Sequence, residues 1–178
     1  MAFMANEFKN LNDLFVQQLE DLYDAEQRIT EALPKMVEAA SSQSLKTAFN
    51  DHLQETERHV TRLEDVFKRI GCEPKRETCM AIKGLLAEGE EMIRAKGDNT
   101  VRDAGLIAAA QRVEHYEMAG YGTVRTFAKQ LGMTDVARIL QQTLDEEGAA
   151  DKKLSSIAES SINIQSPTGV AAGASNYA

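Results

Sequence analysis

Tryptophan is absent from this sequence, and proline and cysteine are scarce, with three and two residues in 178. Aromatic residues make up only 6% of the chain. A composition this poor in aromatics and proline favours helices over a β-sandwich. Cys72 and Cys79 are spaced as neither a zinc knuckle nor a redox C-x-x-C motif. We therefore expect an all-α protein with free, reduced thiols.

Long apolar runs and excess positive charge are also missing. No stretch of 18 apolar residues occurs, and residues 1–10 lack the basic and apolar regions of a signal peptide. The 20 Lys and Arg residues are outnumbered by 28 Asp and Glu residues, which gives a net charge of −8. This balance argues against binding to nucleic acid or to an anionic membrane surface. We expect a soluble, cytoplasmic protein.

Apolar residues at three- and four-residue steps predict four long helices and one short helix. Ser41–Ser44 supplies a turn after the first helix, and Gly71 ends the second. The expected helices span about 8–40, 45–70, 80–93, Asp98 or Thr100 to 132, and Thr134 or Asp135 to about 160.

Two hairpins joined by a crossover that carries a short helix form the ferritin-like version of the four-helix bundle. We assign residues 1–162 to this bundle and residues 163–178, which are small and polar, to a flexible tail. A weak repeat aligns residues 52–63 with 143–154 without gaps, which is consistent with two related halves. Short matches of this kind also arise by chance in amphipathic helices. No further C-terminal helix is visible, so a large cage is not expected.

Ionisable side chains interrupt the apolar stripes of all four long helices. An unpaired carboxylate in an apolar interior must shift its pKa or bind a cation. A histidine and a glutamate one turn apart can hold one ion, and two glutamates one turn apart can chelate or bridge. The predicted metal ligands are Glu26, His52, Glu55, Glu114, Glu117, Glu147 and Asp151.

The predicted ligand set indicates which metals are suitable. Six carboxylates carry a charge of about −6, which two divalent ions reduce to about −2 and two trivalent ions cancel. Oxygen-rich coordination with one imidazole suits iron or manganese better than zinc or copper. We therefore predict two iron ions, with manganese as the alternative.

Each ligand has another interpretation that the sequence leaves open. Glu26 could be ion-paired at the helix boundary, and His52 could be a hydrogen-bonded core histidine. Glu114 and Glu117 could lie on a solvated edge, because helical phase is known only to about one residue. Only one residue of the run 145–147 can point inward. The metal prediction depends on the coincidence across four helices.

Four neighbouring residues are harder to place. His59 shares the stripe of His52 and could lie next to the site or above it. His115 projects about 100° away from both adjacent glutamates, so we place it outside the ligand set. Tyr23 or Tyr121 could lie near the metals and donate a hydrogen bond or an electron.

Four sequence blocks resemble the YciE/YciF-like family of bacterial stress-response proteins. They are Asp24-Ala-Glu-Gln27, His52-Leu-Gln-Glu-Thr56, residues 101–117 and Leu144-Asp-Glu-Glu147, with Glu114-His-Tyr-Glu117 as the most specific. The likeness covers about residues 8–160. It implies a ferritin-like, rubrerythrin-like architecture, a homodimer, a bacterial cytoplasmic location and a role in osmotic, general or oxidative stress.

The di-iron pattern of the ferritin-like superfamily places Glu on the first and third helices and Glu-x-x-His on the second and fourth. Glu26 and Glu114 match this pattern, and Glu117 is an extra acid. The second helix departs from it, reading either His52-x-x-Glu55 or Thr56-x-x-His59, and the fourth reads Glu147-x-x-Ala150 followed by Asp151.

Two functions follow from these patterns. The first is a di-iron or di-manganese protein that oxidises Fe(II) while it reduces dioxygen or peroxide, with Glu55 and Glu117 as movable or bridging ligands. The second is a non-catalytic helical stress protein that acts through association and keeps a vestigial polar interior. A DNA-protecting ferritin relative is disfavoured by the acidic balance and the absence of a basic tail.

Overall fold

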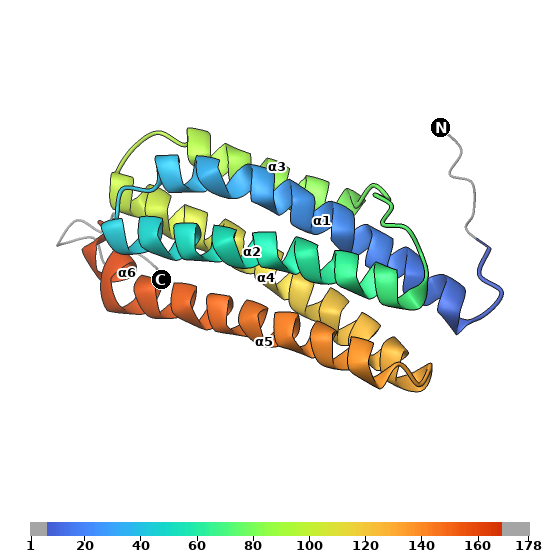
Figure 1. Ribbon diagram of the computed structural model, residues 1–178. Coiled ribbons are helices and arrows are strands. Elements are labelled where there is room, and N and C mark those ends of the chain that lie inside the picture. The colour runs from blue at the N-terminus through green and yellow to red at the C-terminus, as the bar shows by residue number, and fades with distance from the viewer. Residues whose placement is uncertain (1–6, 169–178) are drawn as a thin grey trace, which may run out of the picture.

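The computed structural model describes residues 7–168, and the regular elements in this range are all helices. Helix α3 (Met80–Arg94) lies in the crossover between two hairpins (Figure 1). The four long helices are α1 (Leu11–Ala39), α2 (Gln43–Ile70), α4 (Asn99–Gln130) and α5 (Thr134–Ile157). The predicted all-α bundle with a short crossover helix is confirmed. Between residues 7 and 168, no helix is long and apolar enough to cross a membrane.

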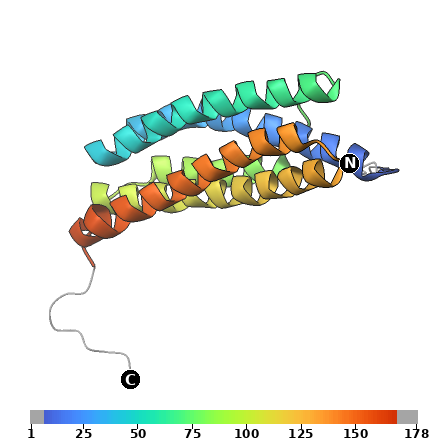
Figure 2. The ribbon, with the colours of Figure 1, turned by 60° about the horizontal axis from the view of Figure 1, so that its bottom comes forward.

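The two hairpins pack on each other as layers. Figure 2 shows α1 and α2 in one layer and α4 and α5 in the other. Helix α1 contacts α4, α2 contacts α5, and α3 packs against α1 and α4. Each long helix therefore turns one face toward a common interior.

The helix ends follow from local capping chemistry. Asn10 accepts a hydrogen bond from the first turn of α1, and Asp98, one of the two expected caps, does the same for α4. Gly71 and Gly132 end α2 and the α4 turn with φ angles of +74° and +77°. Glycine adopts this left-handed conformation without the steric cost that other residues incur.

Two buried aspartates fix the loops that hold the hairpins in place. Asp103 accepts hydrogen bonds from the backbone N–H groups of Ser41 and Ser42, at 2.8 and 2.7 Å, and so closes the α1–α2 turn. Asp24 accepts from the backbone N–H of Cys79 at 2.9 Å and binds Arg28 and Arg76. Burial alone would raise the pKa of Asp24, but these donors hold it below its ordinary value. Both cysteines are free thiols, as predicted.

The C-terminal end of the bundle extends beyond α5. A π-helical turn (Ala158–Ile162) continues the helix, and a last turn, α6 (Asn163–Gln165), follows it. Helical structure thus reaches three residues past the boundary expected at 162. The predicted flexible tail spans residues 163–178, of which residues 169–178 lie outside the described residues.

Two apolar clusters fill the interior, one toward each end of the bundle. One includes Ile29, Leu33, Phe49, Leu106 and Leu154, and the other includes Phe15, Leu19, Phe67, Val124 and Leu140. On each long helix, buried polar residues lie between the segment that joins one cluster and the segment that joins the other. The interior is therefore an apolar–polar–apolar stack.

Candidate metal centre

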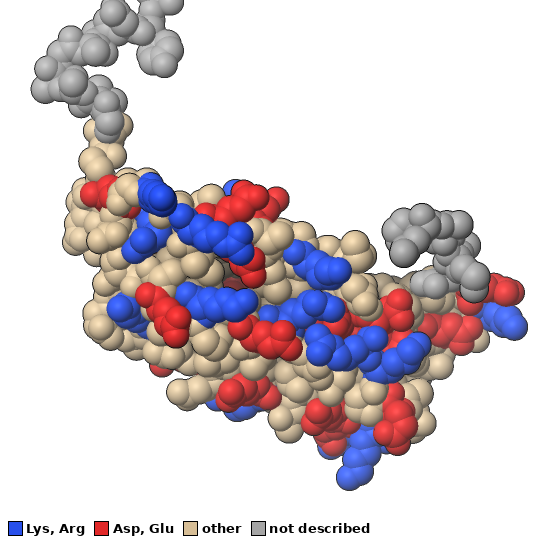
Figure 3. All heavy atoms as spheres, turned by 90° about the horizontal axis from the view of Figure 1, so that it is seen from above, with Lys and Arg blue, Asp and Glu red and all other residues tan. Residues whose placement is uncertain are grey.

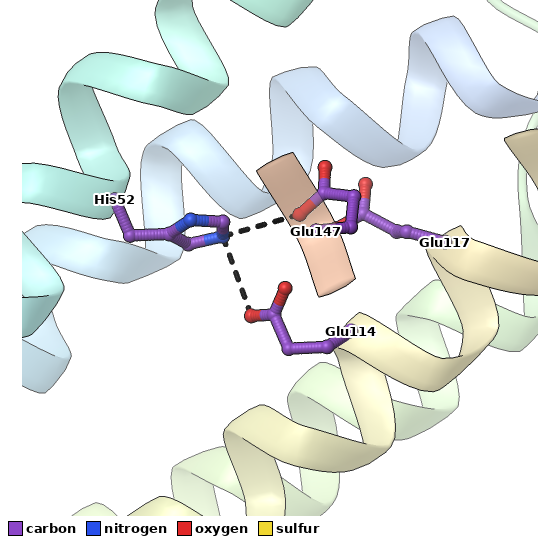
Figure 4. A group of neighbouring side chains, drawn as sticks. All are labelled: His52, Glu114, Glu117 and Glu147. Atoms are coloured by element: carbon purple, nitrogen blue, oxygen red, sulfur yellow. Dashed lines mark ion pairs between the residues drawn. The ribbon is translucent and has the colours of Figure 1, made fainter. Parts of the chain in front are cut away.

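Six ionisable side chains from the four long helices meet in the polar layer. All are at least nine-tenths buried. Figure 4 shows one histidine and three of the glutamates pointing toward one another. The six are Glu26 from α1, His52 and His59 from α2, Glu114 and Glu117 from α4, and Glu147 from α5.

The six residues form two groups that share Glu147. In each group, one ligand atom from every member lies within 4.8 Å of the others, and the groups are His52, Glu114, Glu117 and Glu147, and Glu26, His59 and Glu147. Nε2 of His52 lies 3.8 Å from Oε2 of Glu147, whereas Nδ1 of His59 lies 2.9 Å from Oε1. The two oxygens of Glu147 thus face different histidines, as expected for a carboxylate that bridges two ions.

Further distances complete the two groups. Nε2 of His52 lies 3.3 Å from Oε1 of Glu114, and Nδ1 of His59 lies 3.4 Å from Oε1 of Glu26. The rings of His52 and His59 are 6.4 Å apart between centroids. Each histidine therefore faces its own carboxylate, and the groups lie side by side.

Most polar atoms of the centre are buried without a hydrogen-bond partner among the described residues. A buried polar atom left in this state costs about 1–3 kcal/mol. A metal ion accepts lone pairs from many such atoms at once. The unpartnered atoms are Oε2 of Glu26, both ring nitrogens of His52, Nδ1 of His59, Oε2 of Glu114, and both carboxylate oxygens of Glu117 and Glu147.

A chain of polar contacts behind His59 orients its ring. Nε2 of His59 lies 2.9 Å from Oε2 of Glu146, and Arg62 donates to Oε1 of Glu146 at 2.8 Å. Burial would raise the pKa of Glu146, but Arg62 and His59 lower it to about 2, so this carboxylate stays ionised. When Nε2 donates its hydrogen to Glu146, the lone pair of Nδ1 points into the centre. Metal-bound histidines are commonly supported in this way.

Burial and crowding decide the protonation of the metal-free centre. Burial, together with the neighbouring carboxylates, raises the pKa values of Glu114 and Glu117 well above their ordinary range. Burial would lower the pKa of His59, but Glu147 and Glu26 raise it to about 10. Protons on these groups therefore balance the charge, and a cation that binds must displace them.

Tyr121 supports the centre from the neighbouring apolar cluster. Its hydroxyl group donates a hydrogen bond to Oε1 of Glu26. Burial and the nearby carboxylates raise the pKa of Tyr121, so it remains a protonated donor. Of the two candidate tyrosines, Tyr121 is thus the one at the site, because Tyr23 donates instead to Glu64 at 3.0 Å.

The donor set fits a pair of divalent cations. The four carboxylates carry a charge of −4 when ionised, which two divalent cations neutralise if both imidazoles are uncharged. Oxygen-rich coordination with two imidazoles suits iron or manganese. Four glutamates and two histidines are also the composition of the ferritin-like di-iron set, although the positions differ here.

Two of the seven predicted ligands lie outside both groups. The Glu55 side chain is 33% exposed and lies 3.5 Å from Nδ1 of His52, on the side away from the centre. Asp151 accepts a hydrogen bond from Gln111 at 2.9 Å and lies 3.4 Å from the exposed His115. Glu55 and Asp151 do not join the groups because both lie at the margin of the buried stripe of their helix, so their side chains point to its edge. The charge estimate from six carboxylates is corrected accordingly.

His59 is a candidate ligand that the sequence alone left undecided. The stripe of buried α2 residues passes through His52, Thr56 and His59, and that spacing was the available signal. The depth at which α2 meets Glu26 and Glu147 determines that His59 belongs to the centre. This depth depends on packing between the hairpins. The third histidine, His115, is exposed and lies outside both groups, where the helical projection places it.

Comparisons with known proteins place these features in context. The domain of unknown function DUF892 matches residues 10–166. Protein YciF of Escherichia coli is 44% identical over 156 residues, which cover 87% of this chain and 94% of the relative. The crystal structure of this stress protein matches with a TM-score of 0.85 over 88% of this chain and 99% of that one. YcfI from Rhodopseudomonas palustris matches with a TM-score of 0.84, at 44% identity and the same coverage.

Proposed function

The chain belongs to the DUF892 family, and we propose that it is a stress-response protein whose bundle holds a dinuclear iron or manganese centre. The observation that supports this most strongly is the buried set of unpartnered ligand atoms from four helices. The stress role comes from the relative YciF, which is named a stress protein. A homodimer in the cytoplasm stays a prediction.

The six side chains divide naturally between two ions. Glu26, His59 and one oxygen of Glu147 would hold the first, and His52, Glu114 and the other oxygen of Glu147 the second. Glu117, whose two oxygens have no partner, can chelate or bridge. A bound pair of ferrous ions would supply the two electrons that, with two protons, reduce hydrogen peroxide to two molecules of water.

The surroundings are suited to keep such a centre ordered and dry. Tyr121 holds Glu26, and Glu146 with Arg62 holds His59. The apolar cluster around Phe15, Leu19 and Leu140 excludes water from one end of the polar layer. Electrostatic interactions strengthen when water is excluded. Proper orientation of the ligands therefore comes from the chain itself.

A second candidate function is a non-catalytic helical protein that acts through association. Thr56 and Ala150 stand where the superfamily pattern has Glu and His. The name of the relative YcfI also proposes a structural role for that protein. In this case the polar layer would persist as a protonated network.

Metal analysis of protein purified without chelator separates the two candidates. We expect two iron or manganese ions per chain, none in Glu147→Gln, and two in the control Asp145→Asn, which changes an exposed carboxylate on the same helix. Ferrous protein should then consume hydrogen peroxide, and Glu147→Gln should not. Folded wild-type protein that takes up no ion from anaerobic Fe(II) or Mn(II) would favour the second function.

A further inference from the structure

A cavity of about 240 Å³ connects solvent with the metal centre between α2 and α5. Asp51, Glu55 and Lys153 lie toward its mouth, and His52 and Glu114 lie at its inner end. The exposed fraction of the side chain falls from 52% for Asp51 to 33% for Glu55, 8% for His52 and 3% for Glu114. Carboxylates therefore line this cavity from the surface to the centre.

His52 forms the junction between the cavity and the centre. Its Nδ1 lies 3.5 Å from Oε2 of Glu55, and its Nε2 lies 3.3 Å from Oε1 of Glu114. The residue is 6% exposed, and neither ring nitrogen has a hydrogen-bond partner. A ligand that reaches Glu55 thus meets an unpartnered imidazole that also belongs to the metal site.

The charge along the cavity favours cations. Lys153 is the one cationic side chain that lines it, and its Nζ lies 2.7 Å from Oδ2 of Asp51. Arg58 approaches Glu55 at 3.8 Å without lining the cavity. Acidic clefts raise the local concentration of cations and their rates of association. The Lys153–Asp51 ion pair opposes this effect at the mouth.

The other cavity that reaches His52 and Glu114 is lined by more aliphatic side chains. It measures about 300 Å³, lies between α1, α3 and α4, and is walled mainly by aliphatic side chains. Figure 3 shows the face of α1 and α3, where Lys and Arg side chains alternate with Asp and Glu side chains around a hollow. Arg28, Lys35 and Lys83 line this cavity together with Glu31 and Glu90, and Nζ of Lys35 lies 3.5 Å from Oε1 of Glu90. The charges at this cavity are therefore mixed, and its largely aliphatic walls disfavour the passage of a hydrated metal ion.

We propose that the cavity between α2 and α5 is the path by which divalent cations enter the centre. Glu55 binds the incoming ion transiently and passes it to His52, and the Lys153–Asp51 ion pair restricts access at the mouth. The proposal rests on the proposed function, because it requires that the centre binds metal. It also assigns a role to Glu55, which the sequence singles out but the centre does not use.

The rate of metal uptake tests this path. Metal-free protein is mixed with Co²⁺ in a stopped-flow instrument, and uptake is followed by the visible absorption of bound Co²⁺. Glu55→Gln should slow uptake about tenfold, and Lys153→Ala should accelerate it, with the differences shrinking in high salt. The matched controls Glu57→Gln and Lys152→Ala alter exposed neighbours and should match wild type. All variants should still bind two ions per chain at equilibrium.

The possible failures are distinguishable. Wild-type protein that binds no Co²⁺ at equilibrium would overturn the metal centre and the path together. Wild-type protein that loads normally, with Glu55→Gln and Lys153→Ala at the same rate, would overturn the path alone. Loss of an ion at equilibrium in Glu55→Gln would make Glu55 a resident ligand, which also contradicts the transient role. Thermal melting monitored by circular dichroism checks that each variant is folded.

Discussion

The α1–α2 hairpin and the α4–α5 hairpin contribute different candidate ligands to the proposed centre. The first provides both imidazoles and one carboxylate, and the second provides three carboxylates. The charge of the second set is not neutralised within its own hairpin, because three ionised carboxylates would be buried there without a cation. In the metal-free protein, His59 of the first hairpin pairs with Glu147 of the second at 2.9 Å. Packing of the hairpins therefore completes the centre.

The weak internal repeat shows where this asymmetry arises. The superfamily pattern places Glu-x-x-His on the second helix of each hairpin. Here the first hairpin keeps only the histidine and the second keeps only the glutamate. The register that aligns residues 52–63 with 143–154 pairs Glu26 with Glu117, Thr56 with Glu147 and His59 with Ala150. In this register Glu117 is the counterpart of Glu26, and Glu114, which the sequence comparison with the superfamily pattern had matched, is the additional acid.

Two residues, each one turn from a residue of the superfamily pattern, bring the number of candidate ligands back to six. His52 precedes Thr56 by one turn on α2, and Glu114 precedes Glu117 by one turn on α4. Their side chains meet across the hairpins at 3.3 Å. We interpret this pair as a replacement for the missing glutamate and histidine, at a position closer to the cavity between α2 and α5.

The largest effect should come from removing one imidazole at a time. If the two histidines serve different ions, His52→Ala and His59→Ala should each bind one ion per chain in place of two. Elemental analysis after desalting measures this ratio. The control His115→Ala removes the exposed third histidine and should keep both ions. Loss of both ions from His52→Ala would contradict the division into two groups.

Moving an imidazole from α2 to α5 should make the ligand sets of the two hairpins more alike. Ala150 lines the cavity between α2 and α5 together with His52. The imidazole of Ala150→His can therefore reach the group formed by Glu114, Glu117 and Glu147. The double variant His52→Ala with Ala150→His should regain the second ion, with an affinity about 10- to 100-fold below that of wild type. Competition with a chromogenic chelator measures the affinity. The control pairs His52→Ala with Lys152→His, at an exposed position that does not line this cavity, and its recovery of the ion would contradict the proposed geometry.

Much of this architecture is encoded by periodicity alone. The helices and their inward faces follow from apolar spacing, because burial of these side chains drives the packing. Glu26, His52, Glu114, Glu117 and Glu147 stand out as charges on those faces. The choice between Glu55 and His59 does not follow from spacing, because it depends on the depth at which α2 meets the other hairpin. Asp151 is placed by a cross-helix partner, Gln111, that no local pattern reveals.

A smaller effect should appear in the pH dependence of the free energy of unfolding. Bound metal should reverse the sign of the slope of this free energy against pH. The folded-state pKa of His59 is about 10, against an ordinary value of 6.5, so its contribution is complete below 6.5 and is lost as pH rises toward 10. The raised pKa values of Glu114 and Glu117 act in the same direction, because above pH 4.5 the folded state binds more protons than the unfolded chain. Metal-free protein should therefore lose stability as pH rises.

Metal-loaded protein should gain stability over the same pH range, because a bound cation replaces these protons and binds more tightly when they are scarce. Each proton that differs between the folded and unfolded states changes the free energy of unfolding by about 1.4 kcal/mol per pH unit. Urea unfolding at several pH values between about 6 and 9 measures both slopes. In the metal-free protein, His59→Gln should remove the contribution of His59 to this slope, and Glu117→Gln should remove that of Glu117. Parallel slopes with and without metal would mean that the cation does not displace these protons, and the six side chains would then not be its ligands.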